Sequence, residues 1–261
     1  GRCTFCSIRA MGERIRARDA VLLADEIEFL VRTYGIKEVS FYDDTISWHR
    51  ANFMRLLEEI IRRKLDITWS CMSRVDMVDY EMLCLMKRAG CHQVGYGIES
   101  SSAEILKNVK KNIDLSIVPD RVRDTKRAGL DARLMFMFGN PGETPQTMRD
   151  TLNFALSMKP GLYVFNITVP FPGTEMFAWA EQNGYLGTRD WDMYDLSHAV
   201  MRLPTVSPEE LTSFYHYAYR TAYLRPGALA RRAARFLRPQ EWVTAFYNAK
   251  YFVNVLLNHR S

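Results

Sequence analysis

No stretch of the sequence is apolar for long enough to cross a bilayer, and no signal peptide is visible. Cysteine is scarce: the chain has five, an odd number, and only Cys3 and Cys6 stand close together. Both features disfavour a secreted protein held by disulfides and favour a cytoplasmic one whose thiols are reduced and free to bind metal. The apolar share of 48% and the charged share of 25% are typical of a soluble globular protein with a substantial core.

Acidic residues are absent between Thr212 and Gln240, a segment that contains six arginines. One interpretation is that residues 226–261 form amphipathic helices on a membrane surface, which would suit a lipid-like substrate. The alternative is a helix that packs on the rest of the protein and keeps its arginines in water. Contact with nucleic acid is not expected.

Helical and strand-like patterns alternate along most of the chain. Apolar residues recur at spacings of three and four, which predicts helices at 19–34, 49–64, 79–90 and 144–158. Short β-rich runs predict strands at 37–43, 66–72, 92–98, 131–139 and 162–169. This alternation predicts parallel strands with right-handed helical crossovers, in either a partial barrel or an open doubly wound sheet. After Gly187 the pattern is helical only, with helices predicted at 208–224, 227–237 and 240–257. We therefore expect a core at 1–187 and a C-terminal helical extension at 188–261.

Polar and turn-forming residues follow the predicted strands, at the end of the sheet where parallel α/β folds bind ligands. Any one of them could be a helix cap, but their shared location predicts a site. The residues are Asp43, Asp44, Arg74, Glu99, Ser100, Asn140 and Gly142.

The cysteines of GRCTFCSIRA are spaced C-x-x-C, with the aromatic Phe5 before the second. Taken alone, this spacing fits a disulfide motif, half of a zinc site or the end of an iron–sulfur loop. A zinc-binding interaction module would need two further ligands at short spacing, and none follows.

The series CTFCS, FYDDT, SRVD, GIESSS, FGNPGET and PFPGT resembles the radical S-adenosylmethionine (SAM) superfamily over about residues 1–190. It is most similar to the branch whose members often carry a cobalamin-binding domain ahead of the core, and which includes methyltransferases and cyclases. In the family loop C-x-x-x-C-x-x-C, Cys3 and Cys6 match the second and third cysteines. The first would lie two residues before Gly1, so we expect the sequence to begin inside the cluster loop, with a first strand before it. The fold implied is a partial (β/α)6 TIM-type barrel.

The resemblance implies a [4Fe–4S] cluster on Cys3 and Cys6 and SAM bound beside it, with cobalamin as a further cofactor held by an upstream domain. Asp43 or Asp44 would contact the methionine amino group, and Arg74 would pair with the SAM carboxylate or else with a neighbouring acid. Glu99 and Ser100 would hold the ribose or the methionine end of SAM. Phe5, Met137, Asn140 and Gly142 would lie near the adenine.

The implied function is generation of a 5′-deoxyadenosyl radical for methylation, cyclisation or rearrangement of a small molecule, including lipid or tetrapyrrole-like substrates. An electron donor such as flavodoxin or ferredoxin would be a partner. The alternatives are a methylthiotransferase acting on tRNA or protein, and the zinc-binding module.

Overall fold

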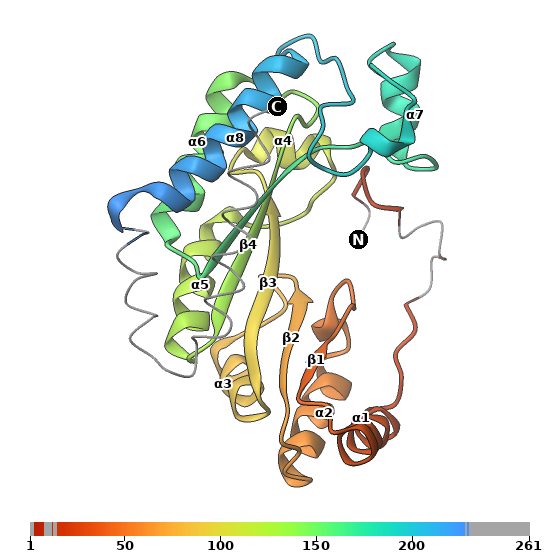
Figure 1. Cartoon of the computed structure of the whole chain (residues 1–261), viewed down its shortest axis with the longest axis vertical. Coiled ribbons are helices and arrows are strands. Elements are labelled where there is room, and N and C mark those ends of the chain that lie inside the picture. Colours follow the sequence, from red (N-terminus) through yellow and green to blue (C-terminus); the bar gives the residue numbers. More distant parts are fainter. Residues whose placement is uncertain (1–2, 8–11, 13–14, 228, 230–261) are drawn as a thin grey trace. The chain divides into compact units, whose positions relative to one another are not determined.

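The computed structural model describes residues 3–7, 12, 15–227 and 229 of the 261-residue chain (Figure 1). It divides into two compact units, residues 1–215 and 216–261. The first unit contains the sheet. The second is described only from His216 to Gly227 and at Leu229.

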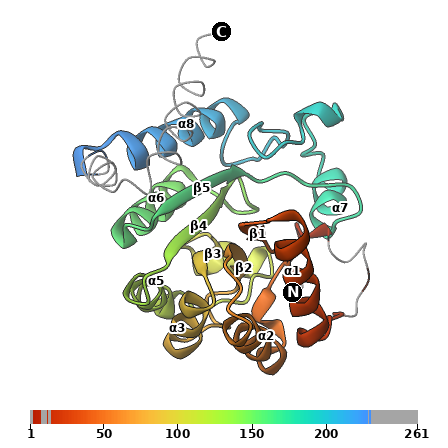
Figure 2. The same cartoon turned by 60° about the horizontal axis from the view of Figure 1, so that its bottom comes forward.

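The sheet of the first unit has five parallel strands in sequential order, β1-β2-β3-β4-β5. It curls, with helices along its outer face, so the predicted partial-barrel fold is confirmed in its five visible strands (Figure 2). A sixth, earlier strand stays a prediction. The strands are β1 (Glu38–Ser40), β2 (Thr68–Ser73), β3 (Cys91–Glu99), β4 (Asp131–Phe138) and β5 (Leu162–Ile167).

The helices alternate with these strands as predicted. Those singled out from the sequence are α1 (Ala20–Tyr34), α2 (Arg50–Arg62), α3 (Tyr80–Arg88), α6 (Pro145–Met158) and α8 (Pro208–Leu224). The others are α4 (Ala103–Asn108), α5 (Val118–Arg127) and α7 (Glu175–Gln182), with short 3₁₀ turns η2 (Ile46–Trp48), η3 (Leu115–Ile117) and η4 (Trp191–Met193).

Side-chain caps fix where several helices begin. Asp19 accepts hydrogen bonds from the first backbone N–H groups of α1, and Asp79 does the same for α3. Thr144 and Thr147 form a reciprocal capping box at the start of α6. Gly35 ends α1 in the left-handed conformation that glycine adopts without steric cost. These local signals keep each helix at its place between two strands.

The two faces of the sheet differ in character because successive strand residues point to opposite sides. The outer face is fully buried beneath the helices and holds Trp69, Tyr96, Leu134, Phe136 and Phe165. The residues between them in sequence line the inner, concave face, where most are only partly buried. By register these include Ser70, Met72, Gly95, Arg133, Met135 and Met137.

Beyond Gly187, the described chain of the first unit adds no strand to the parallel sheet. Leu186 pairs with Met201 in one antiparallel bridge, and Met201 packs with Val109 and Met176 in an apolar cluster. The division into two compact units falls after Tyr215, within the residues of α8, and the predicted boundary at 187 stays a prediction. No helix among the described residues has both the length and the apolar character of a membrane span. The helices predicted at 227–237 and 240–257, and the membrane contact predicted for 226–261, lie almost wholly outside the described residues.

Candidate active site

The two N-terminal cysteines lie on a tight turn that is held at both ends. The Cys6 backbone N–H donates to the Cys3 carbonyl at 3.2 Å, which closes the turn. Thr4 donates its N–H to the Val109 carbonyl at 3.0 Å, and its own carbonyl accepts from Met176 N–H at 2.9 Å. Both cysteines are half-buried. The turn is therefore clamped between the end of α4 and the start of α7 and presents two thiols near the carboxyl ends of the strands.

Phe5 holds this turn in place through an apolar contact. Its ring packs against the apolar cluster formed by Val109, Met176, Ala180, Met201 and Leu203. The aromatic side chain between the two cysteines thus has a packing role in the described chain. Its predicted contact with SAM stays a prediction.

A buried ion pair lies beside the cysteine turn. Lys111 Nζ is 2.9 Å from Glu99 Oε1, and their side chains are only 12% and 10% exposed. Burial raises the pKa of the Cys3 thiol, the Lys111 ammonium opposes that rise and the Glu99 carboxylate adds to it. Cys3, Glu99 and Lys111 therefore share one electrostatic environment.

The backbone is arranged to admit this ion pair. Glu99 ends β3 with a φ of 70°, in the left-handed region that costs a non-glycine residue about 1–2 kcal/mol. A Cβ at Gly97 would lie 2.5 Å from Glu99 Oε1 and 3.2 Å from Lys111 Nζ, so a larger residue there would displace the charged ends of this pair. Strain and a missing side chain at the same point are typical of a functional site.

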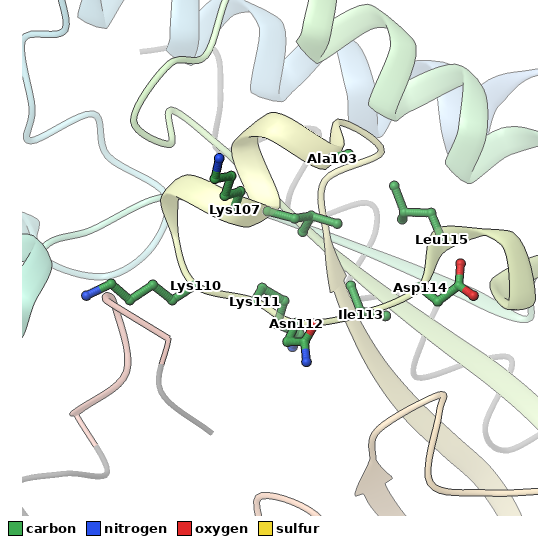
Figure 3. A pocket seen from close by; sticks show the side chains of 9 residues that line it. Ala103, Lys107, Lys110, Lys111, Asn112, Ile113, Asp114 and Leu115 are labelled. Carbon is green, nitrogen blue, oxygen red and sulfur yellow. The ribbon is translucent and has the colours of Figure 1, made fainter.

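Lys111 is a site residue that the sequence patterns did not single out, since a lysine after a short helix looks like a solvated one. It also lines a cavity of about 600 Å³ beside α4 and the loop that follows (Figure 3). The other residues lining that cavity are Ala103, Leu106, Lys107, Lys110, Asn112, Ile113, Asp114 and Leu115.

The loop after β4 brings Gly142 to the cysteine turn. A second cavity, of about 340 Å³, is lined by both Thr4 and Gly142. Gly142 has a φ of 88°, and a Cβ there would approach Asn108 Nδ2 to 2.8 Å. The same amide of Asn108 donates to the Pro141 carbonyl at 3.0 Å, which ties the loop to α4. The cysteine turn and Gly142, both predicted parts of the site, therefore border one cavity.

Asn140 and Glu143 form the buried base of this loop. Asn140 donates from Nδ2 to the Met137 carbonyl at 2.9 Å, and its Oδ1 accepts from Thr168 at 3.0 Å. Glu143 is 1% exposed and accepts from Thr147 Oγ1 at 2.5 Å. Burial raises the pKa of the Glu143 carboxyl to about 7, although its hydrogen bonds act in the opposite direction. The polar groups of this base are committed to holding the loop at the end of β4.

Arg74 is engaged with protein groups. It makes a two-point contact with the Asp76 carboxylate at 2.9 and 2.6 Å, and it donates to the Asn112 carbonyl. The contact with Asn112 fixes the segment directly after Lys111. The structure thus shows the ion pair that was the alternative to SAM binding at this residue.

Ser100 points toward α6. Its hydroxyl lies 3.3 Å from Thr151 Oγ1 and accepts from the Ser102 N–H at 3.1 Å. Asp43 and Asp44 lie on an exposed loop after β1, and no contact joins them to Glu99 or the cysteine turn within the described residues. SAM contacts for these three residues stay predictions.

Comparisons with known proteins identify the family of this chain. Residues 1–155 match the family model of the Radical SAM superfamily. The chain belongs to the radical SAM superfamily. An "uncharacterized methyltransferase" of Pyrococcus horikoshii is 34% identical over 88% of this chain and 50% of its own length. An anaerobic magnesium-protoporphyrin IX monomethyl ester cyclase of Rubrivivax gelatinosus is 25% identical over 87% and 41%.

A solved structure is also similar to this radical SAM chain. It is the radical SAM methyltransferase TsrM from Kitasatospora setae, with cobalamin and a [4Fe–4S] cluster bound. It superposes with a TM-score of 0.65 at 26% identity and covers 72% of this chain and 39% of that one. The chain spans about half, or less, of the length of the curated relatives it matches.

Membership in this superfamily implies a [4Fe–4S] cluster and SAM, and the residues present fit both. Thiolates are the soft ligands that iron–sulfur clusters require, and the cysteine turn presents two of them. A third ligand would come from outside the described residues, among which no group of three His, Cys, Asp or Glu side chains converges. Cys71 and Cys91 are buried next to each other in the sheet, where thiols act as small apolar groups.

Proposed function

We propose that this chain is the core of a radical SAM methyltransferase, in which the cysteine turn binds the cluster and the Glu99–Lys111 pair binds the amino-acid end of SAM. The observation that carries the proposal is the buried ion pair beside Cys3, in space that Gly97 keeps open. When bound, the cluster and SAM together supply the one-electron chemistry of the superfamily. The chain's own residues hold and orient them.

The ion pair matches the two charges that SAM carries on its methionine end. Glu99 can accept hydrogen bonds from an ammonium group, and Lys111 can donate to a carboxylate. Without SAM the two side chains neutralise each other, so neither buried charge is left alone. Binding of SAM would exchange one set of paired charges for another, at little electrostatic cost.

The other predicted residues take supporting roles in this proposal. Arg74 holds the backbone at Asn112 and so positions Lys111. Met137, Asn140 and Gly142 form the end of β4 and the loop over which the adenine would lie, since this loop borders the cavity at the cysteine turn.

Methylation is the reaction that we propose, because the most similar curated relative named above and the solved TsrM structure are both methyltransferases. The TsrM structure holds cobalamin, which supports cobalamin as a further cofactor of the natural protein. Cyclisation is the second candidate, supported by the cyclase relative. The substrate would be a small molecule, and the cluster would receive its electron from a flavodoxin or ferredoxin.

The proposal is tested on the natural protein, purified and reconstituted without oxygen. Lys111→Met should weaken SAM binding in equilibrium dialysis by about tenfold or more, the loss expected for a charge-assisted hydrogen bond. Iron content should not change, because Lys111 is not a cluster ligand. Lys107→Met is the matched control, since Lys107 lies on α4 shortly before Lys111 and lines the same cavity but does not pair with Glu99. Equal SAM affinity in both variants would contradict the assignment.

A further inference from the structure

Arg133 lies on the concave face of the sheet, and no acidic side chain among the described residues pairs with it. In register it stands beside Gly95 of β3 and Leu162 of β5, in the middle of the parallel sheet. Its one hydrogen bond within the described residues is from Nη2 to the sulfur of Met72 at 3.0 Å, and a thioether is a weak acceptor. Its Nε is fully buried and has no hydrogen-bond partner in the part of the chain that the structure describes. A partly desolvated guanidinium in this state reduces stability.

The neighbouring strand leaves space for this guanidinium. A Cβ at Gly95 would lie 3.1 Å from Arg133 Nε, 3.2 Å from Nη2 and 2.4 Å from Met72 Sδ. Glycine in the interior of a strand weakens the strand and marks a close approach by another group. Here two side chains approach, Met72 from β2 and Arg133 from β4, and they meet over Gly95 of β3.

The surroundings of Arg133 on the concave face are apolar and adaptable. Met72 is next to it, and Met135 and Met137 follow on the same side of β4 toward the cysteine turn. Methionine side chains fill irregular contacts with apolar ligands. Met137 lies four residues from Arg133, which is roughly 13 Å along a strand. The concave face thus offers a methionine-lined surface, with the Arg133 guanidinium at the end farther from the cysteine turn.

We propose that Arg133 binds an anionic group, a carboxylate or a phosphate, on a substrate whose apolar body lies against these methionines. A guanidinium suits either anion because its fork of N–H donors matches two oxygens at once. The identification of the ligand as substrate rests on the function proposed above. The presence of an anion site at Arg133 does not depend on it.

The test measures binding of three probes that share one apolar body: 2-naphthoate, 2-naphthyl phosphate and uncharged 2-naphthol. Fluorescence titration of the natural protein should show at least one anionic probe binding about tenfold or more tightly than 2-naphthol, the advantage expected of a charge-assisted pair. Arg133→Met should remove that preference and leave 2-naphthol binding unchanged. Arg133→Lys should keep part of it. The two anionic arms show whether the site prefers a carboxylate or a phosphate.

Ligand-free stability provides a second, independent result. Arg133→Met should raise the melting temperature, because it removes an unsatisfied buried donor and adds an apolar side chain beside Met72. Arg149→Met, on the exposed face of α6, should change neither stability nor binding. An unchanged anion preference in Arg133→Met, or a clear loss of its stability, would overturn the proposal and make Arg133 a structural residue. If the natural protein prefers the anionic probes but does not bind SAM, the anion site stands and only the proposed function is refuted.

Discussion

Replacing Glu143 with glutamine should remove a pH dependence of stability that this carboxyl imposes on the fold. Glu143 is 1% exposed, at the base of the loop that carries Gly142, and burial raises its pKa from 4.5 to about 7. Between these two values the folded protein holds the proton and the unfolded chain does not. The stability contributed by Glu143 is therefore present in full below pH 4.5 and is lost as the pH rises through about 7.

The size of the effect follows from that shift. One pKa unit corresponds to about 1.4 kcal/mol, and integration between pH 5 and pH 8 gives a loss of about 2–3 kcal/mol from this one group. Glutamine has nearly the same shape and cannot ionise, and its carbonyl oxygen can still accept from Thr147 Oγ1. The free energy of unfolding of Glu143→Gln, relative to wild type, should thus rise by about 2–3 kcal/mol from pH 5 to pH 8.

Urea unfolding followed by tryptophan fluorescence, with thiols kept reduced, measures this difference at the two pH values. Glu58→Gln is the matched control, because Glu58 lies on the exposed side of α2. It should show no such change with pH. A relative stability of Glu143→Gln that stays constant from pH 5 to pH 8 would refute a buried carboxyl that is neutral in weak acid.

Two further predictions concern the loop and the thiols. Gly142→Ala should destabilise the fold by about 1–2 kcal/mol more than Gly173→Ala in urea unfolding. Both glycines have positive φ, but only an alanine at 142 would collide with Asn108. Equal losses of stability would show that the close approach to Asn108 is unimportant. Cys6→Ala should abolish iron binding in the anaerobically reconstituted natural protein, whereas Cys84→Ala, on a helix away from the turn, should keep about four irons per chain. Loss of iron in both variants would contradict the assignment of the cluster to the cysteine turn.

The fold could be predicted from the sequence because its periodicities are strong. The five strands and the helices singled out lie within a few residues of the predicted ranges, and Pro208–Leu224 coincides with the prediction. The short helices α4 and α7 have too few turns to show a clear apolar stripe. The placement of Gly142 and the cysteine turn at one cavity followed from the rule that strand carboxyl ends meet.

The charged part of the site could not be predicted in the same way. Lys111 looks like a surface residue in sequence, and its burial depends on a glycine, Gly97, on another element. Arg133 lies in β4, a strand that is mostly apolar in sequence on both faces. The polar–apolar alternation that would show which face is concave is therefore missing, and the role of Arg133 could not be predicted. Arg74 and Ser100 show the converse: both are polar and lie at strand ends, yet their hydrogen bonds go to neighbouring protein groups.

The central claim is that the cysteine turn and the Glu99–Lys111 pair form one site for a cluster and SAM. Electron paramagnetic resonance of the reduced natural protein, with and without SAM, tests it most directly. We expect the spectrum of a reduced [4Fe–4S] cluster that changes when SAM is added, and in Lys111→Met the same spectrum without that change at the same SAM concentration. A protein that binds zinc and no iron, or a cluster whose spectrum responds to SAM equally in wild type and Lys111→Met, would contradict the account.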